Sequence, residues 1–142
     1  MTMIEEPIKP VIKRILIVED NAFFRQFLKE AMYLRFPSID ILEAANGEEA
    51  TQKIKMLSPE AIFMDLRLPG ENGLELTKKI KAQYPDIVVV ILTNYDLPEY
   101  REAAYQSRAD HFLSKDSFLS MINSILANQD IEKDNSKSKE AR

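Results

Sequence analysis

Five polar side chains stand where runs of apolar residues end, and together they could carry out chemistry. Glu19 and Asp20 follow the first run, Asp65 follows a second, Thr93 follows a third, and Lys115 comes just after a fourth. Runs of this length predict buried strands, and the carboxyl ends of parallel strands meet at one edge of a sheet, where ligands bind. The spacing therefore predicts that carboxylate, hydroxyl and ammonium groups converge on one site.

The acidic members of this set predict a metal site. If Glu19, Asp20 and Asp65 lie within a few ångströms of one another, their like charges raise their pKa values and oppose folding unless a cation is present. Oxygen ligands alone favour a hard ion, so we expect Mg²⁺, with Mn²⁺ as a substitute. Because Mg²⁺ is commonly completed by water and by substrate phosphate, a phosphorylated ligand is implied.

The remaining members could act on a phosphoryl group. Lys115 offers a compact positive charge with three donors, and Thr93 offers one more donor. With these groups and the metal on the phosphoryl oxygens, one carboxylate is left to act as a nucleophile. We expect this to be Asp65, because it stands alone at the end of the central strand and Pro69 and Gly70 turn the following loop away.

The wider pattern predicts an α/β fold with five strands and five helices. Nearly continuous apolar runs near residues 15, 40, 62, 88 and 110 indicate strands covered on both faces, and helical periodicity separates them. Helix boundaries are expected at Asn46, at Ser58 and at Tyr84, with Asp20 or Asn21 capping the first helix. The positions expected to pack the helices are Phe23, Phe24, Phe27, Leu28, Ala31, Leu34 and Phe36 in the first, Ala50, Ile54 and Leu57 in the second, Leu76 and Ile80 in the third, and Phe118, Met121, Ile122, Ile125 and Leu126 in the last.

Composition narrows the function classes. The 142 residues carry a net charge of −4, which argues against direct contact with nucleic acid, and contain no cysteine. The amino-terminal residues lack the apolar core of a signal peptide, so we expect a cytoplasmic protein without membrane contact. Residues 1–11 are expected to be a flexible segment, residues 12–128 one folded domain, and residues 129–142 a polar tail or linker.

The motifs at residues 18–20, 65–73, 92–93 and 112–115, taken in order, resemble the receiver domain of bacterial two-component response regulators. The resemblance spans roughly residues 13–127. It implies a doubly wound, flavodoxin-like parallel sheet with strand order 2-1-3-4-5, whose site lies between the first and third strands. Residues 68–70 and the pair Lys115 and Asp116 are most similar to receivers joined to helix-turn-helix DNA-binding domains. The chain would then be a stand-alone receiver or part of a longer regulator.

The resemblance also implies roles for individual residues. Asp65 would accept a phosphoryl group from a histidine kinase or phosphotransfer protein, and Lys115 would assist. Asp20 and Asp65 would bind Mg²⁺ directly, Glu19 would act through water, and the backbone carbonyl of Arg67 would complete the protein ligands. The only catalysis expected is this transfer and slow autodephosphorylation, so the chain would not be an enzyme.

The resemblance further implies how the signal leaves the site. Thr93 and Phe112 would form a switch pair, in which the hydroxyl moves toward the phosphoryl group and the ring turns inward. The fourth helix, near residues 96–106, the fifth strand, residues 109–113, and the fifth helix would carry the altered surface, through which we expect a homodimer to form on phosphorylation.

Two positions depart from the common pattern of the family. Asn94 stands where a small residue is frequent, which predicts restricted access to the site and slow turnover of the phosphoryl group. Asp116 stands where many members have a proline after a cis bond, and a cis bond to a residue other than proline costs about 2.5–4 kcal/mol.

Alternative functions remain open at this point. A flavodoxin-like cofactor binder shares the fold, but Glu19 and Asp20 would repel its phosphate. A metal-dependent aspartyl phosphatase commonly has a second acid two residues after the nucleophile, where this chain has Arg67. A receiver-like module that binds partners without phosphorylation is the remaining alternative. Taken singly, Lys115 could be a solvated lysine or part of a surface ion pair.

Overall fold

The computed structural model describes residues 12–118 and residue 120. Its elements in chain order are β1 (Arg14–Val18), α1 (Ala22–Arg35), β2 (Asp40–Ala44), α2 (Gly47–Leu57), β3 (Ala61–Asp65), β4 (Arg67–Leu68), β5 (Glu71–Asn72), α3 (Gly73–Gln83), β6 (Val88–Thr93), α4 (Pro98–Gln106), β7 (His111–Ser114) and the 3₁₀ turn η1 (Lys115–Ser117). Phe118 and Ser120 are helical, and the rest of the expected last helix lies outside the described residues, as do residues 1–11 and 129–142.

The main sheet has the predicted order. Its five strands lie in the sequence β2-β1-β3-β6-β7, and every neighbouring pair is parallel. This corresponds to 2-1-3-4-5 when the long strands alone are numbered, so the doubly wound prediction is confirmed. Where the sequence predicted only a turn at Pro69 and Gly70, β4 and β5 form a short antiparallel hairpin. Gly70 has a φ of +77°, a backbone conformation that favours glycine.

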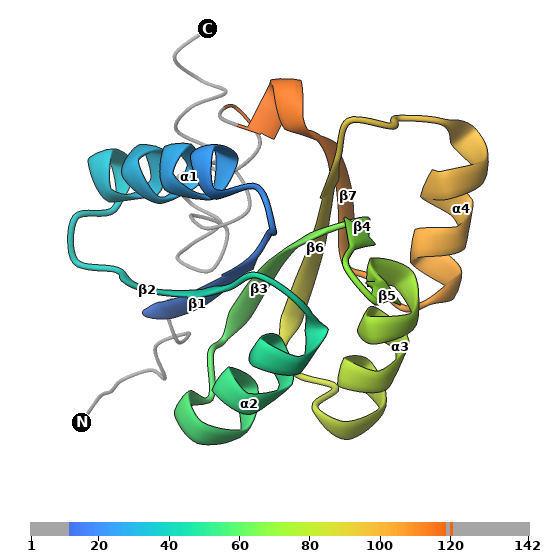
Figure 1. The fold of residues 1–142 in the computed structure, drawn as a ribbon, viewed down its shortest axis with the longest axis horizontal. Coiled ribbons are helices and arrows are strands. Elements are labelled where there is room, and N and C mark those ends of the chain that lie inside the picture. The colour runs from blue at the N-terminus through green and yellow to red at the C-terminus, as the bar shows by residue number, and fades with distance from the viewer. Residues whose placement is uncertain (1–11, 119, 121–142) are drawn as a thin grey trace, which may run out of the picture.

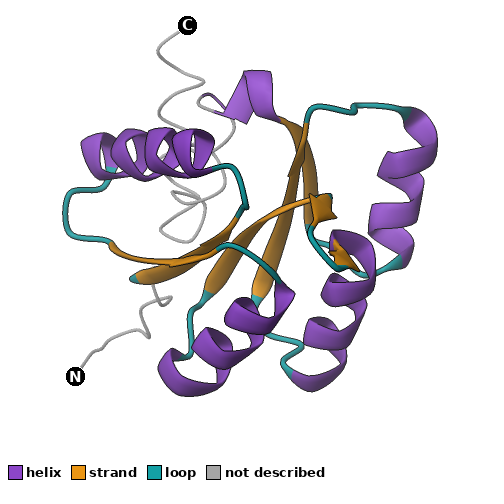
Figure 2. Ribbon diagram, viewed as in Figure 1, coloured by secondary structure: helices purple, strands orange, loops and turns teal. Residues whose placement is uncertain are grey.

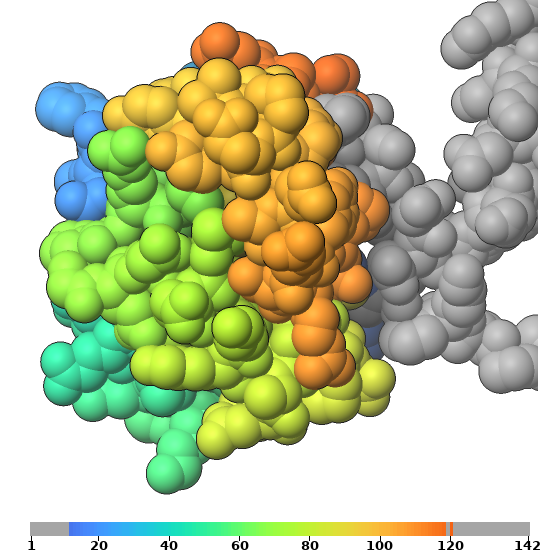
Figure 3. Space-filling model, turned by 90° about the vertical axis from the view of Figure 1, so that its right-hand side faces the viewer, coloured from blue at the N-terminus to red at the C-terminus, as the bar shows by residue number. Residues whose placement is uncertain are grey.

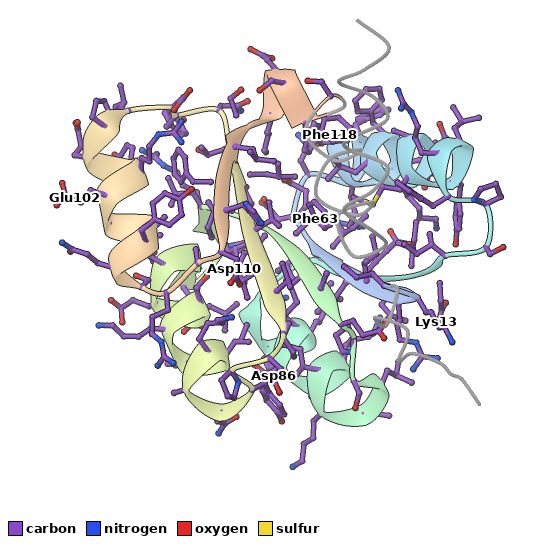
Figure 4. The ribbon with its side chains drawn as sticks, turned by 180° about the vertical axis from the view of Figure 1, so that it is seen from behind. Lys13, Phe63, Asp86, Glu102, Asp110 and Phe118 are labelled. Atoms are coloured by element: carbon purple, nitrogen blue, oxygen red, sulfur yellow. The ribbon has the colours of Figure 1, made fainter. Side chains whose placement is uncertain are left out.

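Helices cover both faces of the sheet (Figures 1 and 2). Side chains alternate along each strand, so Leu16 and Val18 pack with α2, α3 and α4, while Ile15 and Ile17 pack with α1. The core on the α1 side also contains Phe63 and Phe118 (Figure 4), and both side chains are 1% exposed. The central strands are therefore buried on both sides, as their continuous apolar sequences predicted.

Local signals set the helix ends. The side chain of Asn21 accepts the backbone N–H of Phe24 and caps α1, and the side chain of Asn46 caps α2 in the same way through Glu49. Ser58 adopts a left-handed conformation, with a φ of 48°, and ends α2. The predicted boundaries at Asn46, Ser58 and Tyr84 are therefore confirmed, and of the two expected caps for the first helix, Asn21 is the one that acts.

The predicted packing face of α1 is partly wrong. Leu28 and Met32 are its buried residues, whereas Leu34 is 84% exposed, Phe23 is 89% exposed and Phe27 is half exposed. Leu28 and Met32 are four positions apart and share one face, but Leu34 lies two positions further on and points away from it. The sheet side of α1 is thus a narrower stripe than its many apolar residues suggested.

Candidate functional site

The carboxyl ends of four strands bring the predicted residues together. Glu19 and Asp20 follow β1, Asp65 ends β3, Thr93 ends β6, and Lys115 comes directly after β7. An open pocket of about 570 Å³ lies here, and Glu19, Asp20, Asp65 and Lys115 are among the residues that line it. Thr93 is fully buried at the adjoining strand end. The predicted convergence of these groups at one edge is therefore observed, with the threonine below the surface of the pocket.

The three carboxylates form one acidic cluster. Glu19, Asp20 and Asp65 each offer an oxygen within 4.8 Å of the others, and their exposure increases from the buried Glu19 through Asp65 to the exposed Asp20. Burial and, after it, the charge of Glu19 raise the pKa of Asp65 to about 6. Lys115 and backbone hydrogen bonds from Arg67 and Leu66 act against this rise without cancelling it. The cluster thus holds more negative charge than the protein compensates.

Lys115 lies inside this cluster. Its Nζ atom is 2.9 Å from Oε1 of Glu19 and 3.6 Å from Oδ1 of Asp65, and its side chain is only 11% exposed. The ring of Phe24 lies beneath the ammonium group, with 4.4 Å between Nζ and the ring centroid. A solvated lysine, the alternative interpretation of this residue, does not describe these contacts.

Both the side chain and the backbone of Glu19 form hydrogen bonds with the protein. Its Oε2 atom accepts the backbone N–H of Asn21 at 3.0 Å, while Oε1 accepts Lys115. Its backbone N–H donates to the carbonyl of Ala44 at 2.9 Å, and its own carbonyl accepts Nη1 of Arg25 at 2.6 Å. Because both carboxylate oxygens have donors, Glu19 is less available to a metal than Asp20 and Asp65.

The donor chemistry of the pocket fits a hard divalent cation. The uncompensated charge and the raised pKa of Asp65 both favour a bound cation, and the available donors are oxygens. Asp20, Asp65 and the backbone carbonyl of Arg67 are the groups that the resemblance assigns to Mg²⁺. Arg67 lines the same pocket, and its guanidinium group stacks over the ring of Tyr95 at 4.3 Å.

The expected switch residues occupy neighbouring strands. Oγ1 of Thr93 accepts the backbone N–H of Tyr95 at 2.8 Å, and its hydroxyl donates no hydrogen bond to another described residue. The ring of Phe112 is 1% exposed and packs in the core on the α4 side. The guanidinium group of Arg101 in α4 covers this ring, with 4.9 Å between Cζ and the ring centroid. In this structure the aromatic ring therefore already has the inward position.

The two unusual positions also lie at or beside the pocket. The exposed Asn94 lines it beside Tyr95, where it can obstruct access. The peptide bonds of residues 12–118 contain no cis bond, so the one between Lys115 and Asp116 is trans.

Sequence reasoning missed several residues that shape the site. Phe24 and Arg25 contact Lys115 and Glu19 from α1, and nothing in the local pattern distinguishes them from other helix residues. At Gly73, a Cβ atom would collide with the backbone carbonyl of Asp65, so only glycine allows α3 to begin so close to the end of β3.

Fold and site together define a signalling domain of one family. The family model for the response regulator receiver domain matches residues 15–127, and the chain belongs to this family. The chain is 35% identical over 103 residues to the transcriptional regulatory protein LnrK of Bacillus subtilis, and 36% identical over 107 residues to the oxygen regulatory protein NreC of Staphylococcus carnosus. These matches cover 72% and 73% of the chain but only 47% and 48% of the two relatives.

A solved structure gives the same result for the fold. The signal receiver domain of NarL from Mycobacterium tuberculosis superimposes with a TM-score of 0.75 at 27% identity, covering 84% of this chain and 96% of that one. Membership of the family gives the chain a phosphorylation-controlled role in two-component signalling. Among the described residues, no helix has the length and hydropathy needed to cross a bilayer.

Proposed function

We propose that Asp65 is the phosphoacceptor of this receiver. A carboxylate oxygen of Asp65 attacks the phosphorus of a phosphohistidine on a sensor kinase or phosphotransfer protein. The P–N bond breaks as the new P–O bond forms, and the histidine nitrogen keeps the electron pair and takes a proton. The observation that carries the proposal is the position of Asp65, which ends the central strand β3 inside the pocket with the ammonium of Lys115 3.6 Å from its oxygen.

Asp20, Asp65 and the backbone carbonyl of Arg67 would hold Mg²⁺, or Mn²⁺ in its place. The ion would neutralise charge on the phosphoryl oxygens. Lys115 already lies beside Asp65, so its ammonium group reaches a phosphoryl oxygen attached there. Glu19 positions Lys115 from the other side at 2.9 Å.

Phosphorylation would be relayed through Thr93 to the α4 and β7 surface, where the ring of Phe112 already lies inward and would be held there. The new group adds about −1.5 to −2 charges, and the hydroxyl of Thr93 can donate a hydrogen bond to it. Arg101 connects this region, since it covers the ring of Phe112 and pairs with Asp96 at 2.8 Å. Figure 3 shows α4, in yellow and orange, at the surface beside α3 in yellow-green. This surface is where we propose that a homodimer forms.

The output would be transcriptional or another response of a two-component pathway. LnrK carries the name of a transcriptional regulator, and the chain spans less than half of its length. The net charge of −4 favours an output through protein contacts rather than direct contact of this chain with nucleic acid.

Intact mass spectrometry after incubation with acetyl phosphate and Mg²⁺ tests the proposal. The wild-type protein should gain the mass of one phosphoryl group, and Asp65→Asn should gain none. Asp86→Asn is the matched control, because Asp86 is an exposed aspartate just before β6, at the other end of the sheet (Figure 4). Phosphorylation of the Asp65→Asn protein, or none in the wild type, would refute the assignment.

A further inference from the structure

Arg25 connects α1 to the turn that carries the acidic cluster. Its Nη1 atom donates to the backbone carbonyl of Glu19 at 2.6 Å, and its Nε atom donates to Oε1 of Glu43 at 3.0 Å. The side chain is 21% exposed. One guanidinium group thus bridges α1, the turn after β1, and strand β2, the one long strand that contributed none of the predicted site residues.

Glu43 is itself firmly placed. Its second oxygen accepts Nζ of Lys29 at 2.7 Å, and its backbone carbonyl accepts Nζ of Lys53 at 2.7 Å. The hydrogen bonds from Lys29 and Arg25 hold the pKa of Glu43 below its ordinary value, although burial acts against them. Glu43 therefore remains a charged and ordered acceptor for Arg25.

Asp20 depends on this arrangement more than its neighbours do. Within the described residues, the side chain of Asp20 makes no hydrogen bond or ion pair, so its carboxylate follows its backbone. The turn is fixed by the hydrogen bond from the N–H of Glu19 to Ala44, by the hydrogen bond from the N–H of Asn21 to Oε2 of Glu19, and by Arg25 at the carbonyl of Glu19. Loss of the Arg25 side chain would release the carbonyl of Glu19, which belongs to the peptide bond between Glu19 and Asp20.

We propose that Arg25, braced by Glu43, is a positioning residue that places Asp20 for the divalent cation of the phosphorylation site. The proposal rests on the proposed function for the identity of that cation. It makes β2 part of the site through an indirect contact. Groups that orient ligands in this way commonly change metal affinity by about 10–100-fold when they are removed.

The chain contains a matched control for this contact. Arg14 donates through Nε to Asp40 of β2 at 2.7 Å and through Nη1 to the backbone carbonyl of Leu57 at 2.6 Å. It therefore makes the same pair of bonds as Arg25, a carboxylate of β2 and a backbone carbonyl, but at the opposite end of β2. A loss of general stability should follow from either arginine, whereas a change in metal affinity should follow only from Arg25.

The direction of the change in Mg²⁺ affinity shows whether Arg25 acts by positioning Asp20 or only through its charge. Removal of a positive charge near three carboxylates would by itself strengthen the binding of a cation. If Arg25 positions Asp20, then Arg25→Gln weakens Mg²⁺ binding instead. Arg25→Lys keeps the charge but cannot make both directed bonds, so it should also bind Mg²⁺ more weakly than the wild type does.

Isothermal titration with Mg²⁺ in the absence of any phosphodonor is the test. We expect Arg25→Gln to raise the dissociation constant about tenfold, Arg25→Lys to give an intermediate value, and Arg14→Gln to leave it unchanged. Glu43→Gln combined with Arg25→Gln should be no weaker than Arg25→Gln alone, because Glu43 acts through Arg25. Hydrogen exchange of the metal-free proteins should show faster exchange at the amide of Asn21 in Arg25→Gln than in Arg14→Gln.

Unchanged or tighter Mg²⁺ binding by Arg25→Gln would overturn the proposal, as would equal weakening by Arg14→Gln. These outcomes differ from a failure of the proposed function. A wild-type protein that binds Mg²⁺ but gains no phosphoryl group contradicts the role of Asp65 and leaves the role of Arg25 to be decided by the titrations. If the wild type bound no Mg²⁺, the proposed cation site would fall, and the proposal for Arg25 with it.

Discussion

The two ends of the parallel sheet use the same charged residue types in different proportions. At the amino end, Nζ of Lys81 donates to Asp110 at 2.9 Å and to the backbone carbonyls of Pro85 and Ile87. At the carboxyl end, the ammonium group of Lys115 contacts Glu19 and Asp65, while Asp20, the third carboxylate of the cluster, has no cationic partner among the described residues. The pair of Lys81 and Asp110 is balanced, whereas the cluster around Lys115 keeps an excess of negative charge.

This difference separates the structural ion pair of Lys81 from the ion pairs of Lys115, which we propose to be functional. Lys81 and Lys115 are similarly buried, with side chains 8% and 11% exposed, so burial alone does not distinguish them. What distinguishes them is the number of carboxylates nearby. The charges of a balanced pair neutralise each other, whereas an excess of like charge lowers stability until protonation or a bound cation relieves it.

The largest effect is expected at Lys115. Lys115→Ala should still bind Mg²⁺, because the carboxylates remain, but it should respond poorly to activation. Loss of a charge-assisted hydrogen bond to the phosphoryl group costs on the order of 2–3 kcal/mol. We expect the NMR shifts that beryllofluoride induces in α4 and β7 of the wild type to be greatly reduced in the variant.

The exposed Lys79 provides a control for this experiment, since Lys79→Ala removes an ammonium group from a side chain that is 69% exposed. Its response should equal that of the wild type. A normal response of Lys115→Ala would remove the proposed role of this residue.

The next effect concerns stability at the amino end. Asp110→Ala leaves the buried ammonium of Lys81 without its counter-charge and the backbone N–H of Val89 without its acceptor. Because Asp110 is itself 37% exposed, we expect a loss of about 2 kcal/mol in the free energy of unfolding, below the range for fully buried pairs. Urea denaturation measures this loss.

Phosphorylation by acetyl phosphate should proceed at the wild-type rate in folded Asp110→Ala. A variant as stable as the wild type would show that the amino-end pair contributes nothing, and the comparison between the two ends would fail.

A substitution at the carboxyl end should increase the free energy of unfolding, whereas Asp110→Ala decreases it. Folding raises the pKa of Asp65 from 3.8 to about 6, so the folded protein binds this proton more tightly than the unfolded chain does. Stability therefore falls as the pH rises from about 4 to about 6 and remains reduced above that range. Asp65→Asn removes the charge, and we expect the metal-free variant to be more stable at pH 7.5 by on the order of 1–2 kcal/mol.

Denaturation at pH 4 supplies the control, because most of this advantage should disappear there. Saturating Mg²⁺ should also reduce it, since the ion stabilises the wild type by binding to the folded state. An Asp65→Asn protein that is less stable than the wild type at pH 7.5 without metal would contradict the excess of negative charge.

The strand ends could be predicted from sequence because the relevant signals are local. Apolar runs mark the strands, and polar residues mark where they end, so Asp65 and Thr93 were placed correctly from their neighbours alone. Family resemblance then supplied the strand order. Both steps depend on patterns that extend over a few residues and repeat along the chain.

The residues that sequence reasoning missed depend on contacts between distant elements. Arg25 and Glu43 are 18 positions apart and meet only because α1 packs beside β2. Gly73 matters because α3 begins against the end of β3. The error at Leu34 has the same origin, since an apolar residue on a helix is buried only if the tertiary fold covers its face, and α1 is covered along one stripe.

The smallest effect is expected at Phe24, whose ring centroid lies 4.4 Å from Nζ of Lys115. Phe24→Leu keeps an apolar side chain but removes the aromatic face, and we expect the loss of this cation–π contact to cost about 1 kcal/mol, between the values for exposed and for desolvated contacts. The affinity for beryllofluoride at saturating Mg²⁺ should therefore fall only a few-fold, because Glu19 still holds the ammonium group at 2.9 Å. Phe27→Leu is the control, since it changes a neighbouring ring of the same helix face, which packs with Phe24 and Phe118. Equal affinities of the two variants would show that the salt bridges alone position Lys115, and the carboxyl end would then differ from the amino end only in its count of charges.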